Sequence, residues 1–492
     1  FSGGADRLIR MWDTETGKVV RTFEGHQAEV TSVLIDENAN LLISHSTDGV
    51  TRFWDLNTGR EFFEHIHLGE KDWMVKTAEG YFSGTDRARQ SIHFVSGLKT
   101  YSPDQFFDEF YRPDLLPQIF KTRGELKKDE SIQGRLRYSP PPVVRVGVVA
   151  ASQPSKVELY VKVTDQGGGA MNLKIFHNGK NIPLDQELKL PAGKGESTVY
   201  KQHADVVGGI NVFTASASSR DNIESDTHSA EYFSEHVSRA STCYLLAVGI
   251  NDYKNPELSL NYARPDAQSF VKQINENGGK LFKAIELHTL YEEDASRGKI
   301  LSKLDELAGK IHPEDVFIFY YAGHGSMTDT RFFFIPAESL RLYDLKTLQR
   351  EAIEASVMQD KFRNIKALKQ LIIMDACQSG GSVELLATRG GGEEKAIAQL
   401  SRSAGIHVLA SAGSEQLATE FAELGHGLFT YVLIKALAGE ADGAPNDGKV
   451  TIYELKSFID DQMPELTRKL KGKPQYPYTF SRGQDFPIVI EK

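Results

Sequence analysis

The C-terminal half of the chain alternates short apolar runs with longer segments of helical period. Five runs have the length of strands: 243–250, 284–291, 315–323, 368–376 and 405–413. Helices are predicted between and after them, with starts at Pro265, Ser296 and Gly427. Strands that alternate with helices predict a mostly parallel sheet covered on both faces. In such sheets the chemistry collects at the carboxyl ends of the strands.

The middle of the chain, 143–233, follows a period of two residues instead. Segments such as VELYVKVTD and GINVFTASAS alternate apolar and polar positions, and Asn178-Gly179 is a strong hairpin signal. The pattern predicts a small β-sandwich of immunoglobulin-like type, although the Cys…Trp…Cys set of antibody domains is missing. The preceding residues, 124–142, combine a charge run with three prolines, which predicts an exposed linker.

The N-terminal region contains an internal repeat. GADRLIRMWDTETGK and TDGVTRFWDLNTGR place Trp12 and Trp54 42 residues apart, each with an aspartate six residues earlier (Asp6 and Asp48). A spacing of about 40 to 45 residues is typical of propeller blades. With the GH dipeptide that ends at His26, about the first 65 residues resemble the WD-repeat family. The resemblance implies that His26, Asp48 and Trp54 form the buried hydrogen-bond set of a blade.

So few repeats cannot close a propeller ring, which needs about four to eight blades. We therefore expect a partial propeller. The residues from DWMVKTAEGYFSG to DEFYRPDLL resemble the exit segment of bacterial WD-repeat proteases. The opening FSGGADRLIR has neither an initiator Met nor a signal-like pattern, so we expect that the sequence starts inside a longer protein.

Composition narrows the class of protein. At 492 residues, with 40% apolar and 25% charged residues, the chain fits about three globular domains, and it has no apolar run long enough to span a bilayer. A net charge of −10 without a long basic stretch argues against a nucleic-acid binder. The two cysteines, Cys243 and Cys377, provide neither a disulfide framework nor a zinc cluster, which favours the reducing cytoplasm.

Two motifs end consecutive apolar strands and carry the candidate chemistry. VFIFYYAGHGS contains His324, and QLIIMDACQSGG contains Cys377, 53 residues further on. Because a thiol is mostly protonated at neutral pH, a nucleophilic cysteine needs a neighbouring base, which His324 provides. We expect Gly323 and Gly325 to let the backbone turn sharply around the imidazole. The N–H groups of Gly325 and Cys377 are then candidates to hold an oxyanion.

Either motif alone has an ordinary explanation, because a cysteine on an apolar strand is usually a buried hydrophobe, the class to which we assign Cys243. The order of the motifs and their separation, near the roughly 50 residues of caspases, favour a catalytic pair. With AVGINDY, LNYARPDA, HGLFTYVLIKAL and the closing PQYPYTFSRGQDFPIV, residues 242–492 resemble the caspase and metacaspase superfamily of cysteine proteases, including its bacterial caspase-like peptidases.

The residue two before the cysteine bears on specificity. Asp375 stands where mammalian caspases have Gln and where metacaspases have Asp. In metacaspases this aspartate and a second acidic residue, matched by Asp266, lie in the pocket for the residue before the scissile bond, so the resemblance implies cleavage after Arg or Lys. Asp266 also fits a simpler role as a favourable charge in the helical turn after Pro265. Ala322 replaces a common Ser, which leaves the balance between Arg and Lys open.

A Gly-rich stretch, ELLATRGGGEEKAIAQL, follows the cysteine motif at the place where caspase-type enzymes are cut into two subunits. It contains Arg389 followed by glycine, and a cut after Arg389 would match the basic preference. Self-cleavage after Arg389 and a merely flexible loop are both compatible with this composition.

The acidic loop EADGAPNDGKVTIYEL places Asp447, Gly448 and Glu454 at positions five, six and twelve of an EF-hand. Positions one and three are Gly443 and Pro445, so we interpret the loop as a helix connection. We predict no cofactor and no metal site in this loop. Many metacaspases need calcium, so a calcium site elsewhere stays an alternative.

The sequence therefore predicts a multidomain protein with a partial β-propeller and exit segment (1–123), a linker, an immunoglobulin-like β-sandwich (143–233) and an α/β caspase-like domain (242–492). The predicted function is a cysteine endopeptidase that cleaves proteins after Arg or Lys and stays inactive until a partner binds its propeller or sandwich. A non-catalytic scaffold and a different reaction of the same thiol, transpeptidation or ligation, are the alternatives.

Overall fold

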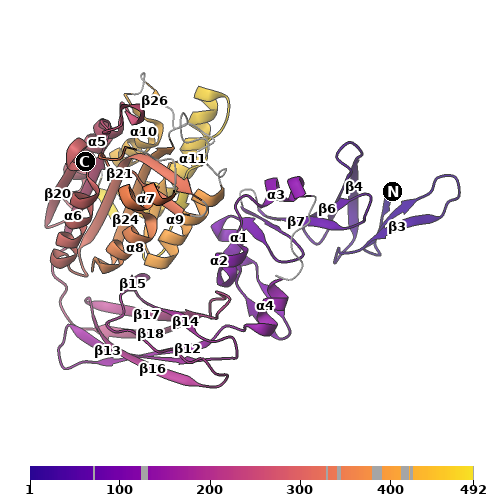
Figure 1. The fold of residues 1–492 in the computed structure, drawn as a ribbon, viewed down its shortest axis with the longest axis horizontal. Coiled ribbons are helices and arrows are strands. Elements are labelled where there is room, and N and C mark those ends of the chain that lie inside the picture. The colour runs from indigo at the N-terminus through magenta and orange to yellow at the C-terminus, as the bar shows by residue number, and fades with distance from the viewer. Residues whose placement is uncertain are drawn as a thin grey trace.

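The computed structural model describes residues 1–69, 72–122, 131–328, 331–340, 345–378, 391–411, 420–421 and 425–490. Along the chain come N-terminal antiparallel sheets with short helices, two further antiparallel sheets and an α/β unit (Figure 1). In the described ranges, no helix is both long and apolar enough to cross a membrane.

The N-terminal strands form two antiparallel sheets. The first contains β1 (Ser2–Gly3), β2 (Ile9–Trp12) and β3 (Val19–Phe23). The second is a six-stranded meander of β4 (Val30–Asp36), β5 (Leu41–Ser46), β6 (Val50–Asp55), β7 (Glu61–Leu68), β8 (Asp72–Lys76) and β9 (Phe82–Gly84). In the described strands the sheets stay open and form no closed ring, as expected of a partial propeller.

The buried hydrogen-bond set predicted for the second repeat is confirmed. His26 Nδ1 lies 3.1 Å from Asp48 Oδ2, and its Nε2 lies 2.8 Å from the hydroxyl of Ser44. Trp54 Nε1 donates to the same hydroxyl at 2.9 Å, so Ser44 joins the two rings. Sequence reasoning missed Ser44, because a serine in the middle of a strand carries no signal of its own.

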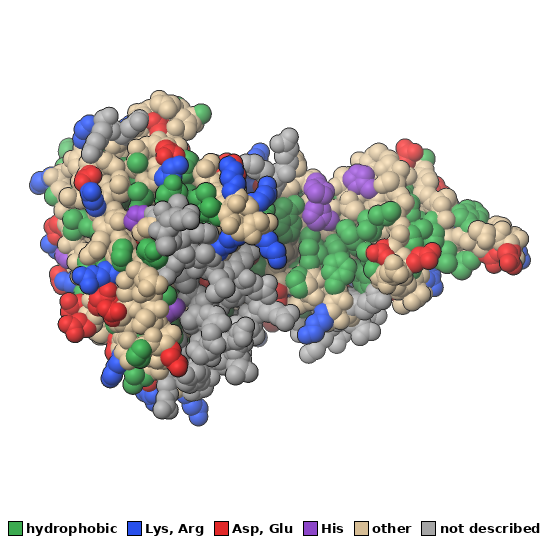
Figure 2. Space-filling model, turned by 90° about the horizontal axis from the view of Figure 1, so that it is seen from above, with side chains coloured by type: hydrophobic (Ala, Val, Ile, Leu, Met, Phe, Trp, Pro, Cys, Tyr) green, Lys and Arg blue, Asp and Glu red, His purple; other side chains and the backbone are tan. Residues whose placement is uncertain are grey.

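The first repeat copies one of these bonds without the burial. Trp12 donates to Ser2 at 2.8 Å across the same ten-residue separation as Trp54 and Ser44. Trp12 is nevertheless 40% exposed, whereas Trp54 is 2% exposed. Apolar side chains gather on the surface over these sheets (Figure 2). Val20 of β3, for example, is 57% exposed.

An exit segment of short elements follows the meander. It contains α1 (Asp86–Ser91), β10 (Phe94–Ser96), β11 (Lys99–Tyr101), η1 (Pro103–Phe106), α2 (Phe107–Phe110), α3 (Leu115–Thr122) and α4 (Ile132–Tyr138). The prediction of an exposed linker over 124–142 is wrong for α4. Ser131 caps this helix, and Ile132 and Leu136, four residues apart on one helical face, are buried. One short apolar pair inside a charge run was too weak a pattern to reveal a helix.

The next unit consists of a three-stranded and a four-stranded antiparallel sheet that share one apolar core. Their strands are β12 (Val143–Ala150), β13 (Lys156–Thr164), β14 (Met171–His177), β15 (Lys180–Ile182), β16 (Ser197–Asp205), β17 (Gly209–Ser218) and β18 (His228–Ser234). The hairpin predicted at Asn178-Gly179 joins β14 to β15, and both residues have the positive φ that such a turn requires. Two sheets are therefore present as predicted, and the immunoglobulin-like type stays a prediction.

The α/β unit is built on a sheet with the strand order β20-β19-β21-β24-β25-β29, whose pairs are parallel except for the last. The strands are β19 (Thr242–Gly249), β20 (Ala284–Tyr291), β21 (Val316–Thr328), β24 (Lys369–Gln378), β25 (His407–Ala410) and β29 (Tyr478–Phe480). An antiparallel extension is formed by β22 (Arg331–Phe334) and β23 (Ile353–Glu354). The predicted mostly parallel sheet is confirmed.

Helices cover both faces of this sheet. The face that contains Leu245 shares its core with α5 (Ala263–Asn277), α10 (Leu428–Lys435) and α11 (Ile452–Lys471). The face that contains Leu246 shares its core with α6 (Arg297–Lys310), α8 (Ala355–Asn364) and α9 (Gly391–Ala404). The sheet is thus buried on both sides, which explains why its strands are apolar throughout.

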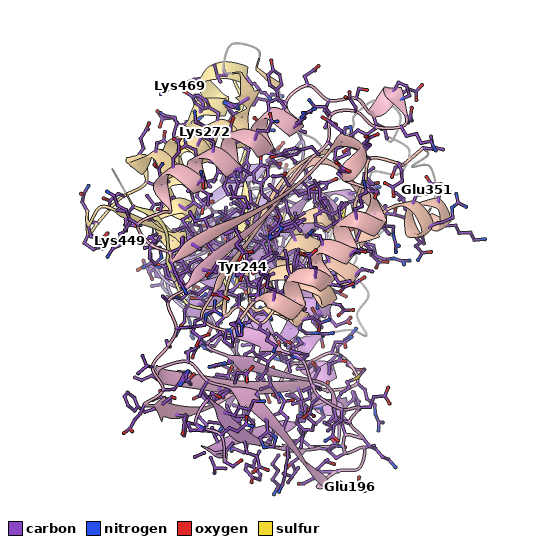
Figure 3. All side chains as sticks on the ribbon, turned by 90° about the vertical axis from the view of Figure 1, so that its left-hand side faces the viewer. Glu196, Tyr244, Lys272, Glu351, Lys449 and Lys469 are labelled. Atoms are coloured by element: carbon purple, nitrogen blue, oxygen red, sulfur yellow. The ribbon has the colours of Figure 1, made fainter. Side chains whose placement is uncertain are left out.

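The sandwich docks on the α/β unit through the tip of its β14–β15 hairpin. Lys180, fully buried, donates from Nζ to the carbonyl of Arg363 at 2.9 Å. A Cβ on Gly179 would lie 2.4 Å from Gly483 Cα, and one on Gly405 would lie 2.0 Å from the Gly179 carbonyl oxygen, so glycine is required at this contact. Figure 3 shows the sandwich below the α/β unit, with Glu196 at the end away from it.

The exit segment docks on α9. The hydroxyl of Tyr111 donates to Glu394, and Lys395 Nζ donates to the carbonyls of Asp108 at 2.6 Å and Tyr111 at 3.1 Å. Arg402, at the other end of α9, forms an ion pair with Asp104 at 2.8 Å. The helix is therefore bound along its length to the region that leaves the propeller.

Candidate active site

The two strands that carry the predicted dyad are neighbours. Strands β21 and β24 pair in parallel, and their register places His324 opposite Cys377 and Gly325 opposite Gln378. For Cys377 the structure describes the backbone alone, and Arg389, the predicted self-cleavage position, lies outside the described residues. The register brings the base and the nucleophile of the prediction to one edge of the sheet, at the carboxyl ends of their strands.

The imidazole of His324 is fixed by backbone and side-chain partners. Its Nε2 lies 2.8 Å from the carbonyl oxygen of Leu258, its backbone N–H donates to the hydroxyl of Tyr253 at 2.8 Å, and the hydroxyl of Tyr321 donates to its carbonyl. Because a carbonyl oxygen only accepts, Nε2 carries the proton of the neutral ring and Nδ1 is the basic nitrogen. A histidine oriented by a third group is the arrangement that a general base requires.

The glycines around His324 have a different purpose from the predicted one. Gly323 and Gly325 lie within the regular strand β21, and neither has a positive φ. A Cβ on Gly323 would lie 2.7 Å from the Tyr253 hydroxyl, and one on Gly325 would lie 2.7 Å from the ring of Phe332. The expectation of a sharp turn is therefore wrong: glycine is needed here because aromatic side chains pack directly on the strand.

The two predicted pocket carboxylates are brought together by the fold. Asp266 lies in the first turn of α5 and Asp375 lies on β24, and both are buried. They meet at Gly427, where an added Cβ would be 2.9 Å from Asp266 Oδ2 and 3.4 Å from Asp375 Oδ2. Gly427 also donates its N–H to Asp266 Oδ2 at 3.0 Å. The sequence identified this glycine, which stands in the HGLFTY motif, only as a helix start and not as part of the site.

Asp375 is held by the helix that follows Gly427. The hydroxyl of Thr430 in α10 donates to Asp375 Oδ2 at 2.7 Å and lies 2.6 Å from the hydroxyl of Tyr320. Burial raises the pKa of Asp375, against hydrogen bonds from Thr430 and Ser411 that lower it. The ionised carboxylate is therefore unfavourable in the free protein.

Three further features were missed. His426 Nδ1 lies 2.7 Å from Asp266 Oδ1, the Leu258 carbonyl orients His324, and Tyr253 packs beside the same imidazole with ring centroids 5.0 Å apart. Tyr253 and His426 stand inside the quoted motifs AVGINDY and HGLFTY, which were the available signal. A backbone carbonyl such as that of Leu258 cannot be found from residue types.

Ala322, paired with Asp375, is buried among apolar side chains.

The acidic loop after α10 is used to start a helix. Thr451 and Glu454 form a reciprocal cap at the beginning of α11, and Glu454 also accepts from the N–H of Gly443. Asp442 accepts from the N–H of Gly448 at 2.8 Å. Across the described ranges, no group of three or more acidic, His or Cys side chains has the arrangement of a metal site.

Comparisons with known proteins match two parts of the chain. Residues 242–485 match the caspase domain family, and residues 17–55 match the WD domain, G-beta repeat. Among curated proteins, CCR4-associated factor 4 of Saccharomyces cerevisiae is 41% identical over 74 residues, which are 15% of this chain and 12% of that protein. Subunit I of eukaryotic translation initiation factor 3 from Schizosaccharomyces pombe is 30% identical over 64 residues, which are 13% of this chain and 20% of that protein.

The chain thus spans only a small part of the curated relatives that it matches. Among solved structures, a protein of Geobacter sulfurreducens superposes with a TM-score of 0.35 at 18% identity, over 51% of this chain and 97% of that one. The parallel sheet, the strand-end motifs and the family match agree for the C-terminal half, and the Trp54 hydrogen-bond set agrees with the repeat match. Residues 242–485 are therefore a caspase domain, preceded in the same chain by a WD-repeat region.

Proposed function

We propose that the protein is a cysteine endopeptidase that cleaves proteins after Arg or Lys. The observation that carries the proposal is the convergence of Asp266 and Asp375 at Gly427, close to the strand ends that bear His324 and Cys377. Asp375 precedes Cys377 by two residues on β24, so the carboxylates and the dyad belong to one edge of the sheet. Two acidic groups beside a thiol and an oriented imidazole favour a substrate with a basic side chain next to the scissile bond.

The proposed chemistry is acyl transfer through a thioester. His324 Nδ1 takes the proton of the Cys377 thiol, and the thiolate attacks the carbonyl carbon of the peptide bond. The N–H groups of Gly325 and Cys377 are the proposed donors to the oxyanion. His324 then gives its proton to the leaving amine, and water, activated by the same ring, hydrolyses the thioester and restores the thiol. These steps use only groups of the protein and water.

The acidic pair sets the proposed specificity. A guanidinium presents its donors as a planar fork that can reach two carboxylates at once, whereas an aspartate side chain would meet two like charges. Peptides with Arg or Lys before the scissile bond are therefore the expected substrates, and Asp peptides are expected to be inert.

The test compares fluorogenic peptides that end in Arg, Lys or Asp, with wild-type protein and Cys377→Ala. Turnover of the basic peptides that disappears in Cys377→Ala is expected. If Asp peptides are cleaved faster than Arg peptides, the assignment of the pocket is wrong. If no condition gives turnover that depends on Cys377, the protease assignment is wrong and a scaffold role of the WD-repeat region becomes the better explanation. A peptide product joined to an added amine would instead indicate transpeptidation.

We further propose that the propeller and the sandwich regulate the peptidase. Two sets of contacts support this: Tyr111 and Asp108 of the exit segment bind α9, and Lys180 of the sandwich binds the last turn of α8. Both helices cover the same face of the catalytic sheet. A protein that bound the N-terminal sheets and shifted the exit segment would therefore move α9, the first described element after Cys377.

A further inference from the structure

The pocket carboxylate Asp266 is already occupied in the free protein. Asp266 is 2% exposed, and its two oxygens are bound by consecutive residues, Oδ1 by His426 Nδ1 at 2.7 Å and Oδ2 by the N–H of Gly427 at 3.0 Å. The side chain of His426 is 25% exposed, whereas that of Asp266 is 3% exposed. The imidazole therefore lies on the outer side of the carboxylate, between it and the solvent.

The two donors differ in how easily they can leave. Gly427 caps α10 and donates from the backbone, in a space that a Cβ would fill. His426 donates from a side chain that can rotate about its own torsions while the backbone of strand β27 (His426–Gly427) stays in place. Burial lowers the pKa of His426, so the ring is neutral at pH 7 and its exchange for a cation adds a charge beside Asp266.

We propose, on the basis of the function proposed above, that His426 is a binding determinant of the pocket, a competitor that the basic side chain of a substrate must displace from Asp266 before it can occupy the site. A guanidinium can reach Asp266 and Asp375 together, so its paired hydrogen bonds replace the lost imidazole contact. An ammonium is a compact charge without a fork and replaces that contact less completely. The imidazole thus competes with both side chains, and its displacement costs each of them the same free energy, whatever their own contacts contribute.

The experiment measures kcat and KM for Arg and Lys peptides with wild type, His426→Ala and His426→Asn. In His426→Ala, the KM for both peptides is expected to fall about tenfold, since a competing contact worth about 1.4 kcal/mol is removed for either side chain. The kcat is expected to change by less than about twofold, so the ratio of Arg to Lys kcat/KM stays near its wild-type value. His426→Asn places an amide donor near the position of Nδ1 and is expected to retain most of the wild-type KM.

An unchanged KM for both peptides in a folded His426→Ala would overturn the inference, as would a loss of kcat at constant KM, which would indicate a role in the chemistry. If the Ala variant does not fold, an unchanged KM in His426→Leu overturns it in the same way. The function proposed above fails separately, if the wild type cleaves neither peptide. Calorimetric titration of Cys377→Ala with agmatine and butylamine, with and without His426→Ala, gives the same comparison without turnover: both amines are expected to bind about tenfold more tightly once His426 is replaced.

Discussion

The hydroxyl of Tyr111 lies 2.5 Å from a carboxylate oxygen of Glu394, and the bond joins the exit segment of the propeller to the first turn of α9. Burial raises the pKa of both groups, so at neutral pH the tyrosine is a donor. The ring of Tyr111 also stacks on Phe107, with centroids 4.4 Å apart. This pair, in which Tyr111 is buried and Glu394 half-buried, is a direct physical link between the N-terminal region and the caspase domain.

Removal of the Tyr111 hydroxyl should loosen α9. In Tyr111→Phe the Glu394 carboxylate keeps its burial and loses its donor, which costs about 1 to 3 kcal/mol. We expect faster amide hydrogen exchange in α9 and an altered basal peptidase rate. Tyr138→Phe is the matched control, because Tyr138 is 78% exposed at the end of α4. Identical exchange in α9 for both variants would contradict the proposed coupling.

Asp375→Asn should keep the thermal stability of the protein and lower its activity on Arg peptides. Because burial raises the pKa of Asp375, its ionised form is unfavourable in the free protein, while an amide oxygen can still accept from Thr430. We expect an unfolding temperature equal to or above that of the wild type and a fall of about 100-fold or more in kcat/KM for Arg peptides, the scale on which a buried charge pair acts. Asp447→Asn, outside the pocket, should change neither. If the Asn variant keeps the preference for Arg, Asp375 is not part of the pocket.

Ser44 should contribute more to the free energy of unfolding than Ser2, its counterpart in the first repeat. Ser44 is 1% exposed and joins His26 to Trp54, so Ser44→Ala leaves two buried ring nitrogens without a partner and should cost about 2 kcal/mol. Ser2→Ala removes the matching bond to the exposed Trp12 and should cost less than about 0.5 kcal/mol. Chemical denaturation of the two variants measures the difference. Equal effects would mean that the second repeat does not depend on its buried set.

The free energy of unfolding of the sandwich should fall below neutral pH because of His177. Burial lowers the pKa of this histidine to about 4, and its Nε2 donates to Asn211 Oδ1 at 2.8 Å. The unfolded side chain protonates near its ordinary pKa of about 6.5, so the contribution is complete above that pH and is lost as the pH falls through about 4, a total of about 3 kcal/mol.

Denaturant unfolding of the wild type, followed from pH 7 to pH 4, should show this loss, and His177→Gln should reduce it. His236→Gln changes an exposed histidine and should keep the wild-type slope. If His177→Gln and the wild type lose stability in parallel, the buried histidine is not its source.

Much of the fold could be predicted because burial leaves strong patterns. The strands of the caspase-domain sheet are covered on both faces, so continuous apolar runs such as 315–323 marked them, and the positive φ of Asn178 and Gly179 followed from their residue types. Weak local patterns failed. Helix α4 has one buried apolar pair in a charged stretch, which reads equally well as a linker.

For the site, the sequence predicted the residues that stand in recognisable motifs, but not the contacts that these residues make across the fold. His324, Cys377, Asp266 and Asp375 stand out by residue type and by resemblance. The partner of Asp266 could not be found in this way, because His426 lies 160 residues further along the chain and the two meet only after α5 and α10 pack on one face of the sheet. The purpose of Gly323 was also hidden, since it depends on the Tyr253 hydroxyl, which reaches the strand from another loop.

The pairing of β24 with β25 has a consequence for any protease that nicks this protein. The residues between 378 and 391 connect β24 to α9. Two sets of contacts join the parts of the chain before and after this interval: Leu371 of β24 pairs with His407 of β25, and Tyr111 and Asp108 bind α9. A single cut in that interval would give two bands on a denaturing gel and one peak in gel filtration. The two polypeptides would stay associated because each contributes strands to the same sheet, so a break in the chain would not release either half.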